Sequence, residues 1–314
     1  MIGVMFDTPF VSYAQNAEDV VLWRALGHVK EGRYVDVGAN QPRVDSVSRA
    51  FYERGWRGIT VEPLGELVAL HRAQRPRHIQ VQVAAAEADA DAVSLHSVPG
   101  TGLSTLVTEV DERNRKEGWP VEDIDVEART LTHILSDAGD DFDEIHFMVI
   151  DLEGAEGQAL SGLDLQRWRP WVLVVEATRP NTTTPSHQAW EQSVIDAGYA
   201  FCLFDGLSRF YVGPEHREAL AALLSYPACV FDDYIPFEQE RLQREVARLE
   251  DRIQDAERQI TRWRHKALVE WAEITAAAAD SEDLAGELKA LHESLSWRVT
   301  EPLRSARRMI GRVL

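Results

Sequence analysis

The sequence predicts an α/β fold in which a mostly parallel sheet carries helices on both faces, followed by a separate helical extension. Short β-branched runs alternate with segments of helical periodicity through the first 200 residues, which is typical of parallel sheets. A β-hairpin pattern around residue 205 closes this series. From residue 237 a heptad repeat of apolar residues with charged flanks replaces the alternation.

The first half of the alternation begins with apolar residues at helical spacing over residues 17–26. We then expect three strands and two helices in turn: strands 33–38, 58–62 and 79–85, and helices 46–54 and 64–74. Residues 93–123 interrupt the rhythm with Pro, Gly and mixed charge, so they are predicted to form an excursion or a lid.

The alternation then resumes and ends in a hairpin. The expected elements are strand 145–151, a helix from residue 155, strand 171–176, a helix that ends at 197, and strands 199–204 and 209–212. They bring the predicted sheet to seven strands. A mostly parallel, Rossmann-like sheet that ends in an antiparallel hairpin is typical of class I methyltransferases.

Composition excludes several classes of protein. The chain has 314 residues, 45% of them hydrophobic, which is enough to bury a core. Its formal charge of -19 argues against nucleic-acid binding, because phosphate contacts need a basic surface. The two cysteines, Cys202 and Cys229, have no metal or redox spacing, and no signal or membrane-spanning segment is recognisable. We therefore expect a cytoplasmic protein whose membrane contact, if any, is peripheral.

Polar residues follow the first two predicted strands and suggest a nucleoside site. Gly38 permits close backbone approach, and Asp36 is placed to accept from the ammonium group of a methionine-type zwitterion. Asn40 completes this turn, and Glu62 ends the second strand, where a carboxylate can accept from both ribose hydroxyls. The turn has no G-x-G-x-x-G, so nothing is predicted to bind a pyrophosphate, and S-adenosylmethionine fits better than NAD.

Several ordered motifs resemble the FkbM-type methyltransferases. They are SYAQNAED at 12–19, DVGAN at 36–40, FYERGW at 51–56, VEP at 61–63, DLEGAE at 151–156 and VEAT at 175–178. The resemblance covers roughly residues 11 to 235. It implies S-adenosylmethionine as cofactor and methylation of an oxygen, commonly of a sugar or polyketide, often in surface polysaccharide synthesis. It also implies that Gln15 and the neighbouring acids close over the cofactor and that Ser104 reaches the pocket.

Carboxylates at the ends of the later strands are the catalytic candidates, because a sugar hydroxyl needs a base or a metal to become nucleophilic. Asp151, which is also predicted to contact the cofactor, follows one strand, and Glu176 ends the next. Two interpretations remain open. Asp151, Glu153 and Glu176 could hold Mg²⁺, or Asp151 or His187 could act directly as the base.

The extension from residue 237 to 296 is predicted to form a coiled coil that oligomerises the chain. Its seam comprises Leu242, Val246, Leu249, Ile253, Ala256, Ile260 and Trp263. Residues 297–314 form a basic amphipathic tail suited to an anionic membrane face or a partner such as a glycosyltransferase. An alternative function is therefore a catalytically inactive scaffold that recruits glycan-assembly partners through this coiled coil.

Overall fold

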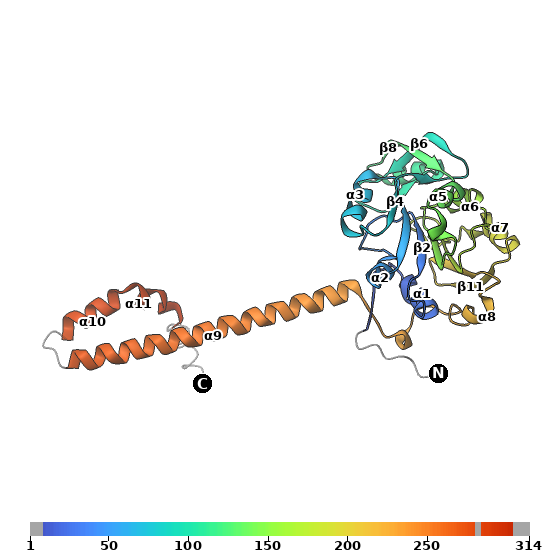
Figure 1. The fold of residues 1–314 in the computed structure, drawn as a ribbon. Helices are drawn as coiled ribbons and strands as arrows, with labels where there is room; N and C mark the ends of the chain where they lie inside the picture. Colours follow the sequence, from blue (N-terminus) through green and yellow to red (C-terminus); the bar gives the residue numbers. More distant parts are fainter. Residues whose placement is uncertain (1–8, 280–283, 304–314) are drawn as a thin grey trace. The chain divides into compact units, whose positions relative to one another are not determined.

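The computed structural model describes residues 9–279 and 284–303. The chain divides into two compact units, Met1–Glu240 and Arg241–Leu314, of which the first contains all the sheets. Figure 1 shows the strands and short helices of the first unit and the long helix that follows.

A seven-stranded sheet forms the centre of the first unit, in the order β11-β12-β10-β9-β2-β3-β4. All neighbouring pairs are parallel except those that β12 makes with β10 and β11, so the predicted mostly parallel sheet with an antiparallel hairpin is confirmed. The strands are β2 (Arg33–Val37), β3 (Arg57–Val61), β4 (Ile79–Val81), β9 (Phe147–Ile150), β10 (Val172–Glu176), β11 (Ala200–Phe204) and β12 (Ser208–Val212).

Alternating side chains of these strands enter two separate cores. On one face Val35, Met148 and Leu173 pack with helices that follow the strands, and on the other face Tyr34 and Phe147 pack with the remaining helices. The first face is covered by α5 (Leu131–Asp137), α6 (Glu156–Ser161) and α7 (Glu191–Asp196), and the second by α1 (Glu18–Leu26), α2 (Arg49–Glu53) and α8 (Arg217–Leu220). Helix α3 (Gly65–Gln74) connects β3 to β4.

A second sheet replaces the irregular excursion expected over residues 93–123. It has the order β5-β8-β6-β7 and is formed by β5 (Ala84–Ala85), β6 (Ala90–Ser97), β7 (Ser104–Thr105) and β8 (Glu122–Arg129), with α4 (Thr108–Glu117) between the last two. The strand predicted over 79–85 is therefore divided between the two sheets. In Figure 1, β6 and β8 lie at the end of the unit opposite α1 and α8.

The ends of the first unit meet in a small parallel pair that the sequence did not predict. Strand β1 (Phe10–Ser12) pairs with β13 (Tyr234–Pro236), and the rings of Tyr13 and Phe237 stack 4.7 Å apart. Three short 3-10 helices complete the unit: η1 (Asp140–Phe142), η2 (His187–Ala189) and η3 (Val230–Asp232).

Helix α9 (Phe237–Ala279) begins at the residue where the composition changes and runs for 43 residues. It is followed by α10 (Leu284–Glu293) and α11 (Leu295–Val299). Most of the predicted basic tail over 297–314 lies outside the described residues. Among the described helices, none is both long and apolar enough to cross a membrane.

The turns after β2 and β9 approach each other closely at the carboxyl edge of the central sheet. The Asp151 N–H donates to the Val37 carbonyl at 3.0 Å, and the Gly38 N–H donates to the Val61 carbonyl at 3.0 Å. Gly38 has a φ of +81°, and a Cβ there would lie 1.8 Å from the Asp151 carbonyl oxygen. The neighbouring backbone therefore requires glycine at this position, and Gly38 also lines the cavity described below.

Gly38→Ala is expected to lower the free energy of unfolding by at least about 3 kcal/mol, because the new methyl group overlaps backbone that cannot retract. Gly118→Ala is the matched control, since Gly118 has a φ of +86° with nothing within 4 Å of a built Cβ. Gly118→Ala should lower the free energy of unfolding only by the cost of placing alanine in the left-handed conformation, about 1–2 kcal/mol. Urea unfolding measures both, and equal losses would contradict the steric explanation.

Candidate functional site

A cavity of about 350 Å³ lies against the carboxyl edge of the central sheet, within the size range of small-molecule sites. Its walls come from the turns after β2, β3 and β9 and from the second sheet. Four carboxylates line it, those of Asp45, Glu62, Asp151 and Glu153. Among the described residues, no lysine, arginine or histidine does, so the cavity suits a cation and offers no side-chain cation to a phosphate.

The Glu62 carboxylate is fixed in the cavity wall by backbone donors on both of its oxygens. The Asn40 N–H donates to Oε2 at 3.0 Å, and the Leu64 N–H donates to Oε1 at 2.9 Å. Burial nevertheless raises the pKa of Glu62 to about 7, with a smaller contribution from the charge of Asp36. This geometry leaves further lone pairs for a diol, as predicted for the ribose.

Asp36 has a different role from the predicted one. Its carboxylate is buried, accepts a hydrogen bond from Ser48 Oγ, and is not among the cavity-lining residues. Ser48 Oγ in turn accepts from the fully buried Arg75 at 2.7 Å, so a cation balances the acid inside the protein. Asp36 therefore stabilises the fold beneath the cavity and does not reach an ammonium group within it.

Asp151 and Glu176 meet as predicted, because β9 and β10 are parallel neighbours paired in register. Asp151 lines the cavity, whereas Glu176 is buried, and Glu176 Oε2 has no hydrogen-bond partner among the described residues. Burial and then the charge of Asp151 raise the pKa of Glu176 far above its usual range, while burial raises the pKa of Asp151 and its interaction with Glu176 opposes this. These shifts favour the protonated form of Glu176, whose proton is available to the Asp151 carboxylate.

The turn that carries Glu153 is held by its neighbour Glu156. One oxygen of Glu156 accepts from the Leu152 N–H at 3.0 Å and from the Gly154 N–H at 2.9 Å. Thr105 Oγ1 donates to the Glu153 carbonyl at 3.0 Å, which ties the turn to the second sheet. Glu153 lines the cavity with a φ of +52°, and burial followed by the charge of Asp151 raises its pKa.

His187 does not lie in the cavity. It begins η2, its Nε2 lies 3.8 Å from Glu191 Oε2, and burial followed by the charge of Arg209 lowers its pKa. Of the predicted catalytic residues, Asp151 lines the cavity, whereas His187 and the buried Glu176 do not. His146, which the sequence places in the core, is buried, and its Nδ1 accepts from the Arg33 N–H at 3.1 Å.

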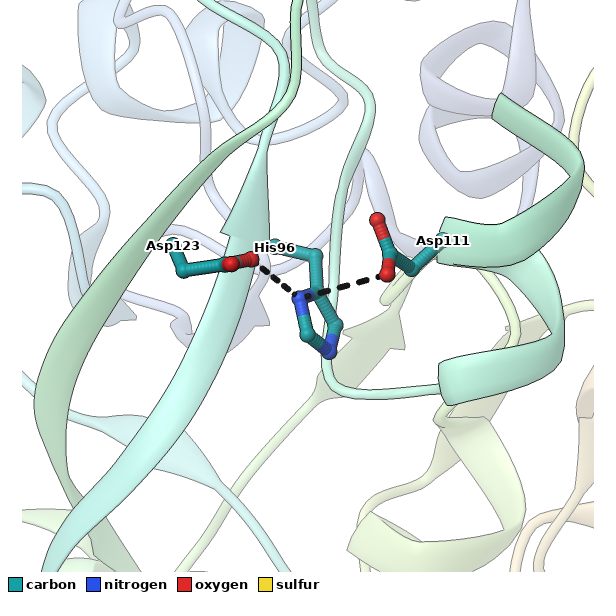
Figure 2. Close-up of side chains that lie close together, drawn as sticks. All are labelled: His96, Asp111 and Asp123. Carbon is teal, nitrogen blue, oxygen red and sulfur yellow. Dashed lines mark hydrogen bonds and ion pairs between the residues drawn. The ribbon is translucent and has the colours of Figure 1, made fainter. Parts of the chain in front are cut away.

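The predicted magnesium ligands do not converge. Among the described residues, the only three acids or histidines whose ligand atoms gather within 4.8 Å are His96, Asp111 and Asp123, in the second sheet and α4 (Figure 2). His96 Nδ1 lies 2.7 Å from Asp123 and 3.7 Å from Asp111, and Arg115 bonds to both carboxylates. A cation of the protein thus already neutralises this cluster, and Asp151, Glu153 and Glu176 form no comparable group.

Gln15 and Ser104 line the cavity as predicted. Of the acids that follow Gln15, Asp19 holds the segment before Gln15 in place. Its carboxylate accepts from Ser12 Oγ at 2.6 Å and from the Tyr13 N–H at 2.7 Å. Sequence reasoning missed the lining residues of the second sheet and its connections, chiefly Leu95, Thr101 and Trp119. The signal available for them was a tryptophan isolated among charged residues.

Comparison with known proteins agrees with this geometry. The family model of the methyltransferase FkbM domain matches residues 36–201, more than half of the chain, a span that includes Gly38, Glu62, Asp151 and Glu176. No curated protein matches. The crystal structure of a TehB-like SAM-dependent methyltransferase from Corynebacterium glutamicum matches with 9% identity and a TM-score of 0.35, over 62% of this chain and 86% of that one. From the family match, the chain belongs to the FkbM methyltransferase family and is an S-adenosylmethionine-dependent methyltransferase.

Proposed function

We propose that this methyltransferase acts on the hydroxyl oxygen of a sugar, in the assembly of a bacterial surface polysaccharide. The observation that carries the proposal is the acid-lined cavity, in which Asp151 follows the strand beside the one that ends in the buried Glu176. A hydroxyl needs a proton acceptor during methylation, and a carboxylate of raised pKa at the reaction centre supplies one. Labelled methyl transfer to a panel of nucleotide sugars and lipid-linked glycans tests the acceptor class.

S-adenosylmethionine fits the residues at the carboxyl edge of the sheet. Its sulfonium and ammonium groups are cationic, and the cavity carries four acids and, among the described residues, no side-chain cation. Glu62 would accept from the ribose hydroxyls, and Gln15, Asn40, Ser104 and the Gly38 turn would surround the remainder. When bound, the cofactor supplies an electrophilic methyl group.

Asp151 is the proposed general base, and Glu176 is a positioning residue that acts through it. Asp151 would take the proton of the acceptor hydroxyl as the oxygen gains its methyl group, and would later return that proton to solvent. The proton that Glu176 donates keeps the Asp151 carboxylate oriented and partly offsets the burial that raises its pKa. Glu153, Trp119 and Asn181 line the same cavity and would contact the sugar. The proposed steps use no metal ion, and Asp151, Glu153 and Glu176 are not among the described residues whose ligand atoms gather within 4.8 Å of one another.

The helical extension is proposed to bring copies of the enzyme together through a coiled coil. Its apolar seam is exposed along α9, and residues of this kind repeat every 3.5 positions. The scaffold alternative shares this feature but predicts no cofactor binding, so calorimetric titration with S-adenosylmethionine separates the two functions.

Affinity for S-adenosylmethionine is expected to rise about tenfold per pH unit up to about pH 7 and then level off. Only the ionised Glu62 carboxylate accepts from both ribose hydroxyls, and its pKa is raised to about 7, so acid weakens binding. Glu62→Gln should remove the pH dependence and lower affinity at pH 8 about tenfold or more. Glu66→Gln, at an exposed position of α3, is the control and should keep the pH dependence with a slightly lower midpoint, because the charge of Glu66 contributes to the raised pKa of Glu62. A flat profile in the unmodified protein would contradict this role.

Asp151→Asn is expected to lower kcat for methyl transfer about 10²- to 10⁴-fold, because the base is lost. Glu176→Gln should cost less than about tenfold, since the amide donates to Asp151 much as the protonated carboxyl does. Labelled methyl transfer to the best acceptor of the panel measures both, with cofactor affinity measured in parallel. Equal losses in the two variants would show that Glu176 acts as an ionised group.

Activity is expected to survive dialysis against excess EDTA and to gain nothing from added Mg²⁺, because proton transfer to Asp151 needs no Lewis acid. The measurement is the rate of labelled methyl transfer before and after chelation. A loss that Mg²⁺ restores would favour the ligand set of Asp151, Glu153 and Glu176 instead.

A further inference from the structure

The longest exposed apolar surface of the described residues is the seam of α9. Leu242, Val246, Leu249, Ile253, Ile260 and Trp263 are between 42% and 70% exposed, with alanines at 256 and 267 continuing the same heptad positions. From Leu242 to Ala267 this stripe is about 38 Å long at 1.5 Å per residue. A stripe of this length on a charged helix indicates a helical partner.

We propose that α9 pairs with α9 of a second copy in the antiparallel orientation, in the register that sets Ile253 against the partner's Ala256. The inference rests on the self-association proposed above and adds its geometry. In this register Val246 faces the partner's Trp263, and Ala267 faces the partner's Leu242.

Side-chain volume favours this arrangement over a parallel one. In a parallel, in-register pair each residue of the seam meets its own copy, so Ala256 and Ala267 would form underfilled layers while Trp263 would be crowded against another indole. The antiparallel register gives each alanine a large partner and gives the indole a valine. Alternation of large and small residues across a seam is what close packing requires.

The net charge of one segment of α9 favours the same orientation. Between Arg258 and Val269 the helix carries four cationic side chains and no acid, so a parallel pair would place this segment beside its own copy. In the antiparallel register, the segment lies beside residues 240–251, where acids outnumber arginines. Glu245 then flanks the partner's Lys266, and the symmetry of the dimer repeats this pair. The positions that flank the seam do not distinguish the orientations. The antiparallel register also sets Glu250 beside the partner's Glu257, while a parallel pair would set Arg252 beside the partner's Glu257 and Glu245 beside the partner's Glu250.

The antiparallel register has a consequence for the enzyme. Phe237, where α9 begins, would lie opposite the partner's Ala272, which separates the two helix starts by on the order of 50 Å. Neither catalytic unit therefore needs the other to complete its cavity, whose lining residues all come from one chain. Dissociation of the dimer should leave cofactor affinity unchanged.

Disulfide trapping in the full chain with Cys202 and Cys229 replaced by serine tests the orientation. Mixing Glu245→Cys with Lys266→Cys protein should give an interchain disulfide in most chains under mild oxidation, because these positions are adjacent only in the antiparallel register. The matched pair Arg252→Cys and Glu257→Cys is adjacent only in a parallel coil and should stay unlinked. The reverse pattern would overturn the orientation. A monomer in analytical ultracentrifugation would overturn the self-association itself, whatever the methyltransferase activity.

A charge exchange provides a second readout at exposed positions that leave the seam intact. Within α9, Glu245 lies 3.6 Å from Arg248, and Lys266 lies 3.7 Å from Glu270 and over the Trp263 ring at 5.9 Å from its centroid. Glu245→Lys or Lys266→Glu should each weaken dimerisation about tenfold, since two symmetric contacts become repulsive. The double variant should return to within about threefold of the unmodified chain. Additive losses in the double variant would overturn the proposed contact.

Discussion

The backbone contact between Gly38 and Asp151 is the constraint on which the site depends. It joins the turns after β2 and β9, the two neighbouring strands from which the chain proceeds in opposite directions across the sheet. Ligands of open α/β sheets bind at this reversal of strand order. Because the turns touch, the carboxylates that follow the strands are held at one edge, and Glu176 is brought under Asp151.

This edge concentrates negative charge, and the protein does not neutralise all of it. Asp36 is balanced through Ser48 by the buried Arg75, and one oxygen of Glu156 accepts from two backbone N–H groups. Glu62, Asp151 and Glu153 face the cavity without a cation, so burial raises the pKa of each. A buried acid with a raised pKa makes the unligated fold less stable as the pH rises from its ordinary value to the raised one. A cationic cofactor offsets this cost, which couples binding to stability.

The second sheet and the long helix have different roles in the protein. The second sheet lies between β4 and β9 in the chain and supplies the cavity wall that carries Ser104, while Thr101 and Trp119 line the cavity from the connections of this sheet. It closes a site that the central sheet alone would leave open, and its ionic cluster around Arg115 joins β6, α4 and β8. Helix α9 adds no residue to the cavity, and its apolar surface is directed to association instead of catalysis.

The sequence determined the order and type of the central elements, since short β-branched runs that alternate with segments of helical periodicity mark strands and helices in turn. It also located Gly38, Glu62, Asp151 and Glu176, because the carboxyl ends of parallel strands meet at one edge. Contacts between segments distant in sequence were decided only by the tertiary structure. The sequence alone did not show that Asp36 pairs with Arg75 through Ser48, or that His187 does not line the cavity. It also did not show that residues 93–123 contribute to a sheet. Each of these outcomes depends on which distant segments the fold brings together. The periodicity of apolar residues along the chain indicates which face of a strand or helix a residue occupies. Which residue it contacts on that face is decided by the tertiary structure.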